Sequence, residues 1–233
     1  MAEGWDALIQ ANFGTPLSWE QAVMQNEPNW ERGIGRANAI PAMLHIIVYP
    51  QEVPWGTDQV LAHYRQMLPG WEIRVWTGET LRMFPDFVRF AADPSMPWIV
   101  LADLARILIL ERFGGVYLDL DFWIQQDLRP LLAAGTPFIG GELASGETVA
   151  SNAVLGAPAR HPAMIRVKEA ALEVLIDRTS QSRLWLGPPF WNTQAGEGEW
   201  RLLPASMFAP VPFSNRLRVQ EAVEFGLVPE AFA

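Results

Sequence analysis

The sequence contains no cysteine, which excludes disulfide bonds, zinc-thiolate sites and thiol nucleophiles. It contains one lysine, Lys168, so its other basic side chains are arginines and histidines. With a formal net charge of −9, the composition argues against electrostatic binding to nucleic acid or to an anionic membrane surface. We therefore expect no nucleic-acid partner, and the lack of cysteine fits a reducing compartment.

Long hydrophobic runs and targeting segments are also missing. The most apolar window, WIVLADLARILILERF, is interrupted by Asp103 and Arg106 and is too short for a membrane span. The first ten residues, MAEGWDALIQ, lack the basic region and the continuous apolar stretch of a signal peptide. The sequence thus predicts a cytoplasmic protein without a transmembrane segment.

Apolar β-branched segments alternate with helical segments along the chain. Strands are predicted at 40–50 and 70–78 with a helix between them, the usual opening of a doubly wound sheet. Further predictions are a helix at 98–112 capped by Gly114, strands in GVYLD, TPFIGGE and SNAVLGA, and a helix at 162–176. We expect an α/β fold in one domain, with an open, mostly parallel twisted sheet flanked by helices. Residues 1–38 would form an N-terminal cap, 39–210 the core and 211–233 a C-terminal extension.

Two aspartates, Asp119 and Asp121, follow an apolar run directly after a glycine pair, Gly114 and Gly115. If a strand carries them, both carboxylates project from one face, because side chains alternate along a strand. Their repulsion is relieved by a proton, by an arginine, or by a divalent cation held against a polyanionic ligand. At the carboxyl edge of an open α/β sheet, where ligands usually bind, such oxygens suit Mn²⁺ or Mg²⁺.

The preceding helix carries two charges on an otherwise apolar surface. Asp103 and Arg106 are three residues apart and therefore share one helix face. They form either a buried salt bridge with each other or hydrogen bonds to ligand hydroxyl groups, and the sequence leaves both interpretations open.

The stretch ADLARILILERFGGVYLDLD resembles the core of the DXD-containing sugar transferases of glycosyltransferase family 32. That group includes initiation-specific mannosyltransferases and is related to the glucosylating bacterial toxins. The pattern is D-x-x-R, a helix ending in Gly-Gly, then an apolar residue, tyrosine, an apolar residue and D-x-D. Its positions here are Asp103, Arg106, Gly114, Gly115, Val116, Tyr117, Leu118, Asp119 and Asp121. Looser fragments, IPAMLHIIV, DLRPLL, SNAVLGAPARHP and LGPPFW, extend the resemblance over about residues 40–210.

The resemblance implies a GT-A type fold, a nucleoside-diphosphate sugar donor and a divalent metal, Mn²⁺ or Mg²⁺. It implies that Asp119 and Asp121 hold the metal and contact the donor, and that Arg106 joins them in catalysis. Asp103 and Arg106 would bind the sugar hydroxyls. The other residues that it assigns to substrate binding are His45, Ile46, Ile47, Tyr117, Asn152 and Gly187.

The function implied by the resemblance is transfer of a sugar from a UDP- or GDP-sugar to a hydroxyl group, with retention of configuration. The acceptor would be a glycan, a lipid-linked molecule or a protein. Val48 stands where the family usually has tryptophan, and the chain ends without the His and Ser-Trp elements that often close the donor site. The alternative is a non-catalytic nucleotide-sugar-binding or scaffold protein that keeps the donor pocket but lacks these closing elements.

A haloacid-dehalogenase phosphatase is another alternative, because it also places D-x-D after an apolar strand and uses the first aspartate as nucleophile. Such an enzyme needs a lysine at the site, and Lys168 is the candidate. Among the 11 tryptophans, Trp185, Trp191 and Trp200 stand in loop-like sequence, where an aromatic face could stack on a sugar ring.

Overall fold

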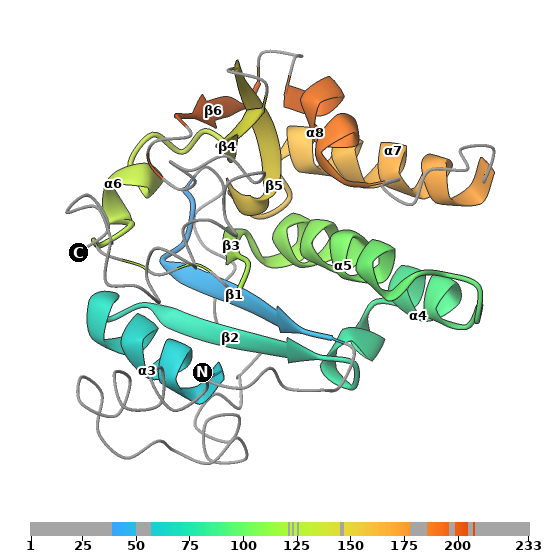
Figure 1. Cartoon of the computed structure of the whole chain (residues 1–233), viewed down its shortest axis with the longest axis horizontal. Coiled ribbons are helices and arrows are strands. Elements are labelled where there is room, and N and C mark those ends of the chain that lie inside the picture. Colours follow the sequence, from blue (N-terminus) through green and yellow to red (C-terminus); the bar gives the residue numbers. More distant parts are fainter. Residues whose placement is uncertain are drawn as a thin grey trace, which may run out of the picture.

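A computed structural model describes residues 39–49, 57–120, 122, 124, 126–144, 147–177, 186–195, 199–204 and 207. The predicted cap at 1–38, the extension at 211–233 and Asp121 lie outside these residues, so the division of the chain into cap, core and extension stays a prediction. The described strands are β1 (Met43–Val48), β2 (Glu72–Thr77), β3 (Gly115–Leu118), β4 (Phe138–Ala144), β5 (Glu147–Ala157) and β6 (Arg201–Leu203). The helices, shown with the strands in Figure 1, are α3 (Thr57–Met67), the 3-10 turn η1 (Thr80–Met83), α4 (Pro85–Ala91), α5 (Trp98–Phe113), α6 (Arg129–Leu132), α7 (Pro162–Asp177) and α8 (Pro188–Ala195).

The six described strands form one sheet in the order β2-β1-β3-β5-β4-β6. β1 pairs in parallel with β2 and β3, and β4 pairs in parallel with β6. β5 is antiparallel to both of its neighbours, β3 and β4. Within this sheet only β5 runs against the other strands, which confirms the predicted α/β fold with a mostly parallel sheet. Two residues, 145 and 146, separate β4 from β5, and strands joined so closely pair antiparallel.

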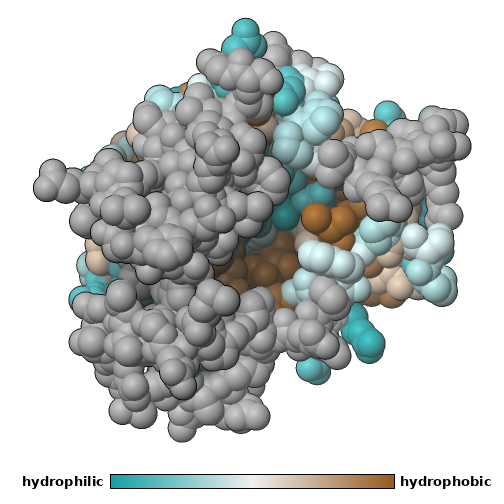
Figure 2. All heavy atoms as spheres, viewed as in Figure 1, coloured by the Kyte–Doolittle hydropathy of each residue, from teal (hydrophilic) through white to brown (hydrophobic). Residues whose placement is uncertain are grey.

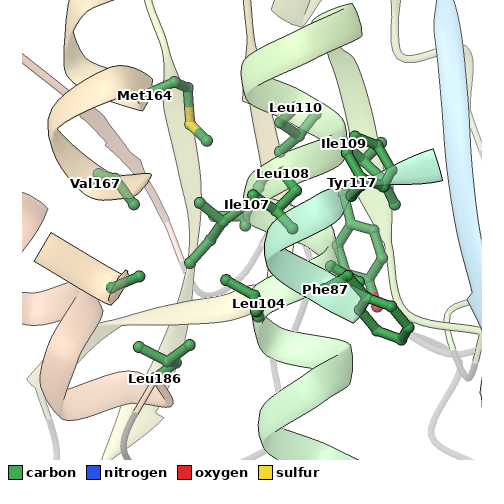
Figure 3. Close-up of a cluster of buried hydrophobic side chains, with 14 of the residues drawn as sticks. Phe87, Leu104, Ile107, Leu108, Ile109, Leu110, Tyr117, Met164, Val167 and Leu186 are labelled. Carbon is green, nitrogen blue, oxygen red and sulfur yellow. The ribbon is translucent and has the colours of Figure 1, made fainter. Parts of the chain in front are cut away.

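Helices cover both faces of the sheet (Figure 1). α3 packs on one face, where Leu61 belongs to a buried cluster with residues of β1, β2 and β3. α5 and α7 pack on the other face, and Figure 3 shows Leu104 and Ile107 of α5 beside Met164 and Val167 of α7. Burial between the sheet and α7 explains why α5 is apolar on nearly every side.

The glycine pair connects α5 to β3 through backbone conformations that favour glycine. Gly114 caps α5 with φ 64°, and its N–H donates to the carbonyl of Leu110 at 2.9 Å. Gly115 begins β3 with φ 100°. A Cβ atom at Gly114 would lie 2.4 Å from the backbone nitrogen of Ala159, and one at Gly115 would lie 2.6 Å from the carbonyl oxygen of Met43. Both positions therefore need glycine for conformation and for space.

The predicted helices at 98–112 and 162–176 are confirmed to within about one residue at each end. η1, α4, α6 and α8 were not predicted, although Pro85 at the first turn of α4 is a common helix-start signal. No helix in the described ranges is both long and apolar enough to cross a membrane.

Candidate functional site

Asp119 lies directly after β3, at the carboxyl end of the strand. Its backbone N–H donates to the carbonyl of Ala153 at 2.9 Å, and its own carbonyl accepts a long 3.4 Å bond from the N–H of Phe122. The chain therefore turns at Leu120, and the prediction that a continuing strand carries both aspartates is wrong, because strand alternation ends at Leu118. The position of the Asp121 side chain lies outside the described residues.

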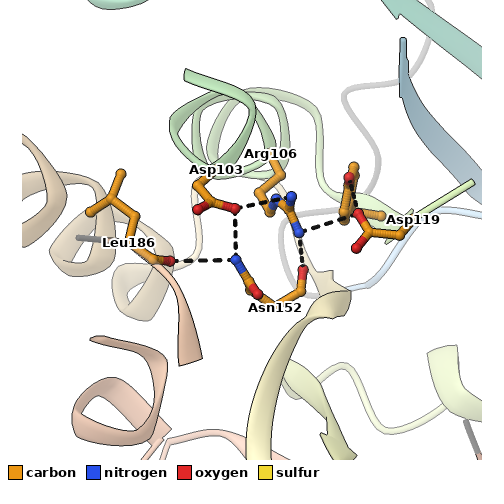
Figure 4. Close-up of polar contacts among 6 residues, drawn as sticks. Asp103, Arg106, Asp119, Asn152 and Leu186 are labelled. Atoms are coloured by element: carbon orange, nitrogen blue, oxygen red, sulfur yellow. Dashed lines mark hydrogen bonds and ion pairs between the residues drawn. The ribbon is translucent and has the colours of Figure 1, made fainter. Parts of the chain in front are cut away.

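Arg106 is the centre of a polar group buried between α5, β3 and β5 (Figure 4). One terminal nitrogen, Nη2, lies 3.0 Å from Oδ1 of Asp103 on the same helix face. The other, Nη1, donates to the carbonyl of Asn152 at 2.5 Å and lies 3.3 Å from Oδ1 of Asp119. The guanidinium plane also lies over the ring of Tyr117, with Cζ 4.5 Å from the ring centroid. One arginine thus links the buried helix to the motif and to the neighbouring strand.

Asn152 completes this group from β5. Its side-chain amide donates to Oδ1 of Asp103 at 2.8 Å and makes a longer 3.4 Å contact with the carbonyl of Leu186 (Figure 4). Asp103 and Arg106 are each 6% exposed, and Asn152 is 9% exposed. Oδ1 of Asp103 therefore has two partners, the amide of Asn152 and the guanidinium of Arg106, and a buried charge needs such partners.

Burial sets the ionisation of the two acidic groups that flank Arg106. It raises the pKa of Asp103 to about 6, while Arg106 acts in the opposite direction and the charge of Asp119 adds to the rise. Burial also raises the pKa of the Tyr117 hydroxyl well above its usual value, again opposed by Arg106. Tyr117 therefore keeps its proton, and its hydroxyl donates a hydrogen bond to Oδ1 of Asp119 at 2.5 Å.

The structure brings five of the predicted residues together and leaves others apart. The group contains Asp103, Arg106, Tyr117, Asp119 and Asn152. Gly187 follows Leu186, whose carbonyl touches the Asn152 amide, so it borders the group. The carbonyl of Leu186 was not predicted, because a main-chain acceptor has no signature in the sequence.

His45, Ile46 and Ile47 lie in β1, next to the motif strand but within the sheet. His45 is fully buried, donates from Nε2 to the carbonyl of Gly114 at 2.8 Å, and accepts at Nδ1 from the indole of Trp76 at 3.1 Å. Burial lowers its pKa to about 3, so the ring is neutral. Both ring nitrogens are used inside the protein, and His45 holds the glycine pair in place. Ile46 is fully buried and Ile47 is half-buried.

Two of the three tryptophans predicted to lie in loops, Trp191 and Trp200, are buried. Trp191 belongs to α8 and is fully buried, and Trp200 is 8% exposed and stacks edge-on against it at 5.5 Å. These two were wrong as candidates for a sugar platform, because they fill the core beside β5. Trp185 lies outside the described residues.

Asp119 fits a divalent cation. Its Oδ1 atom is held by Tyr117 and Arg106, whereas Oδ2 makes no bond to another described residue, and the side chain is 35% exposed. A partly exposed carboxylate oxygen of fixed direction suits Mn²⁺ or Mg²⁺. Within the described ranges no three acidic or histidine side chains gather as a metal site, so Asp119 would act with groups beyond them. Figure 2 shows a hollow over β1 and α5, with an apolar floor beside hydrophilic residues.

Comparison with known proteins finds a family match that covers four residues of this group, Asp103, Arg106, Tyr117 and Asp119. Residues 60–137 match the family described as glycosyltransferase sugar-binding region containing DXD motif. The chain is 32% identical over 143 residues to inositol phosphoceramide mannosyltransferase 3 of Schizosaccharomyces pombe, covering 60% of this chain and 39% of the relative. It is 29% identical over 132 residues to mannosyl phosphorylinositol ceramide synthase SUR1 of Saccharomyces cerevisiae, covering 54% of this chain and 33% of the relative. The chain thus spans well under half the length of these relatives.

A solved structure has the same fold. The glycosyltransferase PaToxG superposes with a TM-score of 0.55 and 12% identity, covering 98% of this chain and 88% of that one. At this identity the likeness shows the fold, and the fold agrees with the expected GT-A type arrangement.

Proposed function

We propose that this chain is a metal-dependent glycosyltransferase that uses a nucleoside-diphosphate sugar. The match of residues 60–137 to the DXD-containing glycosyltransferase sugar-binding region supports this proposal. The observation that carries the proposal is the bridge made by Arg106 between Asp103 and the motif residue Asp119. The bridge sets a hydrogen-bonding helix face beside a partly exposed carboxylate at the carboxyl edge of the sheet, where ligands of such sheets bind.

We propose a separate role for each residue of the site. Asp119, with Asp121, would hold Mn²⁺ or Mg²⁺, and Tyr117 and Arg106 keep the Asp119 carboxylate in one orientation. A bound divalent cation would supply charge neutralisation for the departing diphosphate. Asp103 and Arg106 would meet the sugar hydroxyls, and burial of both strengthens such hydrogen bonds. We propose that transfer proceeds with retention, with no carboxylate nucleophile.

The names of the relatives suggest the sugar and the acceptor. One of them is named an inositol phosphoceramide mannosyltransferase and another a mannosyl phosphorylinositol ceramide synthase. We therefore propose mannose as the transferred sugar, GDP-mannose as the first donor to test, and a lipid-linked hydroxyl group as the acceptor.

The test combines donor binding with turnover. Thermal-shift measurements with GDP- and UDP-sugars, with and without Mn²⁺, should show stabilisation by one donor only in the presence of metal. Asp119→Asn should remove most of that stabilisation. Equal stabilisation of wild type and Asp119→Asn would refute the site. Release of nucleoside diphosphate from the bound donor distinguishes an enzyme from the alternative of a non-catalytic binding protein, and proton NMR of the product tests retention.

The phosphatase alternative loses support from the position of Lys168. Its ammonium pairs with Glu111 at 3.2 Å, between α7 and the C-terminal end of α5. Asp103, Arg106 and the motif lie on other turns of α5 and after β3. The one lysine of the sequence is therefore engaged elsewhere, and the nucleophilic Asp119 of a phosphatase would lack it.

A further inference from the structure

The chain that follows the D-x-D motif is tied to helix α3 by two hydrogen bonds to its backbone. The hydroxyl of Tyr64 donates to the carbonyl of Phe122 at 2.7 Å, and Nε2 of His63 donates to the carbonyl of Ile124 at 2.6 Å. These partners are 58 and 61 residues apart in the sequence. We call residues 122–129 the post-motif segment.

Further contacts fix the far end of the post-motif segment. The indole nitrogen of Trp71, just before β2, donates to Oδ1 of Asp127 at 3.2 Å. Arg129 pairs with Asp127 and donates to the carbonyl of Pro69. The segment is thus tied at one end to α3 and at the other to the start of β2.

The anchors on α3 are buried, which makes them strong constraints. Tyr64 is fully buried and His63 is 6% exposed. Ile124 is 5% exposed and belongs to the same apolar cluster as Tyr64. In such surroundings water does not compete for the hydroxyl or the ring N–H, so breaking either bond is costly.

The acceptors are main-chain carbonyls, and this decides what the anchors do. A bond to a side chain would fix that side chain, whereas a bond to a carbonyl fixes the path of the backbone. Phe122 directly follows Asp121 in the sequence. The N–H of Phe122 also donates to the carbonyl of Asp119 at 3.4 Å. Fixing the Phe122 carbonyl therefore restricts the turn that begins at Asp119, whose side chain Tyr117 and Arg106 hold.

We propose that His63 and Tyr64 are positioning residues for the motif residue Asp119 and the turn that follows it, acting through the backbone of Phe122 and Ile124. This inference rests on the proposed function, because it assumes that the positioned site binds a divalent cation and a nucleoside diphosphate. Some residues orient ligating carboxylates without touching the metal. Their replacement typically lowers metal affinity or activity by about 10- to 100-fold.

The experiment compares Tyr64→Phe, His63→Leu and His63→Gln with wild type. Phenylalanine removes only the hydroxyl, leucine removes the ring donor, and glutamine retains an amide donor at similar reach. His161→Leu is the matched control, since His161 accepts at Nδ1 from the N–H of Ala163 at the start of α7, away from the motif. Hydrogen exchange measured by mass spectrometry reports on the post-motif segment in the ligand-free protein. Calorimetry with Mn²⁺ and GDP- or UDP-sugars reports on the site.

We expect faster exchange in the post-motif segment of Tyr64→Phe and His63→Leu, with exchange in β1 and β2 unchanged. We also expect donor affinity in the presence of Mn²⁺ to fall by about 10-fold in each, and His63→Gln to recover both properties. His161→Leu should change neither. Faster exchange without weaker binding, or weaker binding without faster exchange, overturns the positioning role alone. A wild type that binds neither Mn²⁺ nor a nucleotide sugar overturns the proposed function together with it.

Discussion

Arg106 and Asp119 join the buried helix α5 to the turn after β3, with Nη1 of the arginine 3.3 Å from Oδ1 of the aspartate. The same guanidinium reaches Asp103 through Nη2 at 3.0 Å. It therefore bridges a buried carboxylate and one that is 35% exposed. A planar guanidinium can hold both in fixed directions, which a lysine ammonium cannot reproduce.

Replacing Arg106 tests this bridge. Arg106→Ala leaves Asp103 buried without its cation, and we expect the free energy of unfolding to fall by about 3–5 kcal/mol. The measurement is urea unfolding at neutral pH. Arg166→Ala serves as the control, because Arg166 pairs with Glu199 while both are about half exposed, and such surface pairs contribute less than about 1 kcal/mol. Equal losses in the two variants would contradict a central role for Arg106.

Tyr117→Phe separates the hydroxyl from the ring. The variant loses the hydrogen bond to Asp119 but keeps the aromatic face under Arg106. We expect the fold to persist and donor affinity in the presence of Mn²⁺ to fall by about 10- to 100-fold, because a hydrogen bond to a charged group contributes about 1.5–3 kcal/mol. Calorimetric titration measures the change. Unaltered affinity would show that Asp119 does not need this donor.

Asn152→Asp places a second carboxylate beside Asp103, where the amide now donates at 2.8 Å. We expect lower stability at pH 7 and partial recovery at pH 5, because one of two adjacent carboxyl groups binds a proton as the pH falls. Thermal unfolding at both pH values measures this effect. Asn192→Asp is the control, since the Asn192 side-chain oxygen accepts from the N–H of Ala150 and an aspartate can still accept. A pH-independent loss in Asn152→Asp would count against the carboxylate pairing.

The raised pKa of Asp103 predicts a pH dependence of stability. Burial lifts this pKa from 3.8 to about 6 in the folded protein, against the opposing effect of Arg106. Between these values the folded state binds more protons than the unfolded chain, so the contribution of Asp103 to stability falls as the pH rises through that window. We expect Asp103→Asn to remove roughly 3 kcal/mol of this dependence, at about 1.36 kcal/mol per pKa unit. Urea unfolding across this window provides the test, and parallel pH profiles for variant and wild type would disprove it.

Gly115→Ala tests the turn before the motif. With φ 100° and a Cβ atom that would lie 2.6 Å from the carbonyl oxygen of Met43, alanine is both strained and crowded. We expect a loss of about 3 kcal/mol from the two effects. Gly70→Ala is matched for a positive φ, 78°, but its nearest contact is an arginine side-chain atom at 3.4 Å, so a loss of about 1 kcal/mol is expected. Denaturant unfolding of both variants gives the comparison.

Much of the fold could be predicted because its signals are local. Prolines, the Gly114 cap and runs of apolar residues marked α5, α7 and most strands within a few residues. The turn at Leu120 could not be predicted in this way, because the same residues are compatible with a longer strand. The antiparallel direction of β5 depends on its pairing with β3, a long-range contact.

The candidate site likewise contains residues that the sequence could indicate and residues that it could not. The motif pattern indicated Asp103, Arg106, Tyr117 and Asp119, and their contacts confirm that they form one group. The pattern gave no indication of His63 and Tyr64, because their acceptors are backbone carbonyls about 60 residues away and any residue could supply them.

By itself, the sequence determined which chemical groups are present: no thiol, one lysine, two motif aspartates and a charged pair on an apolar helix. The tertiary structure decided how they are used. For Asp103 and Arg106 the sequence allowed either a salt bridge within the pair or contacts with a ligand. In the structure Arg106 pairs with Asp103 and also lies next to the motif residue Asp119. In the structure His45 is buried and hydrogen-bonded to the backbone of Gly114, and Trp191 and Trp200 belong to the core. The physical reason is that burial and hydrogen-bond partners depend on which distant segments pack together, and residue order along the chain does not specify these.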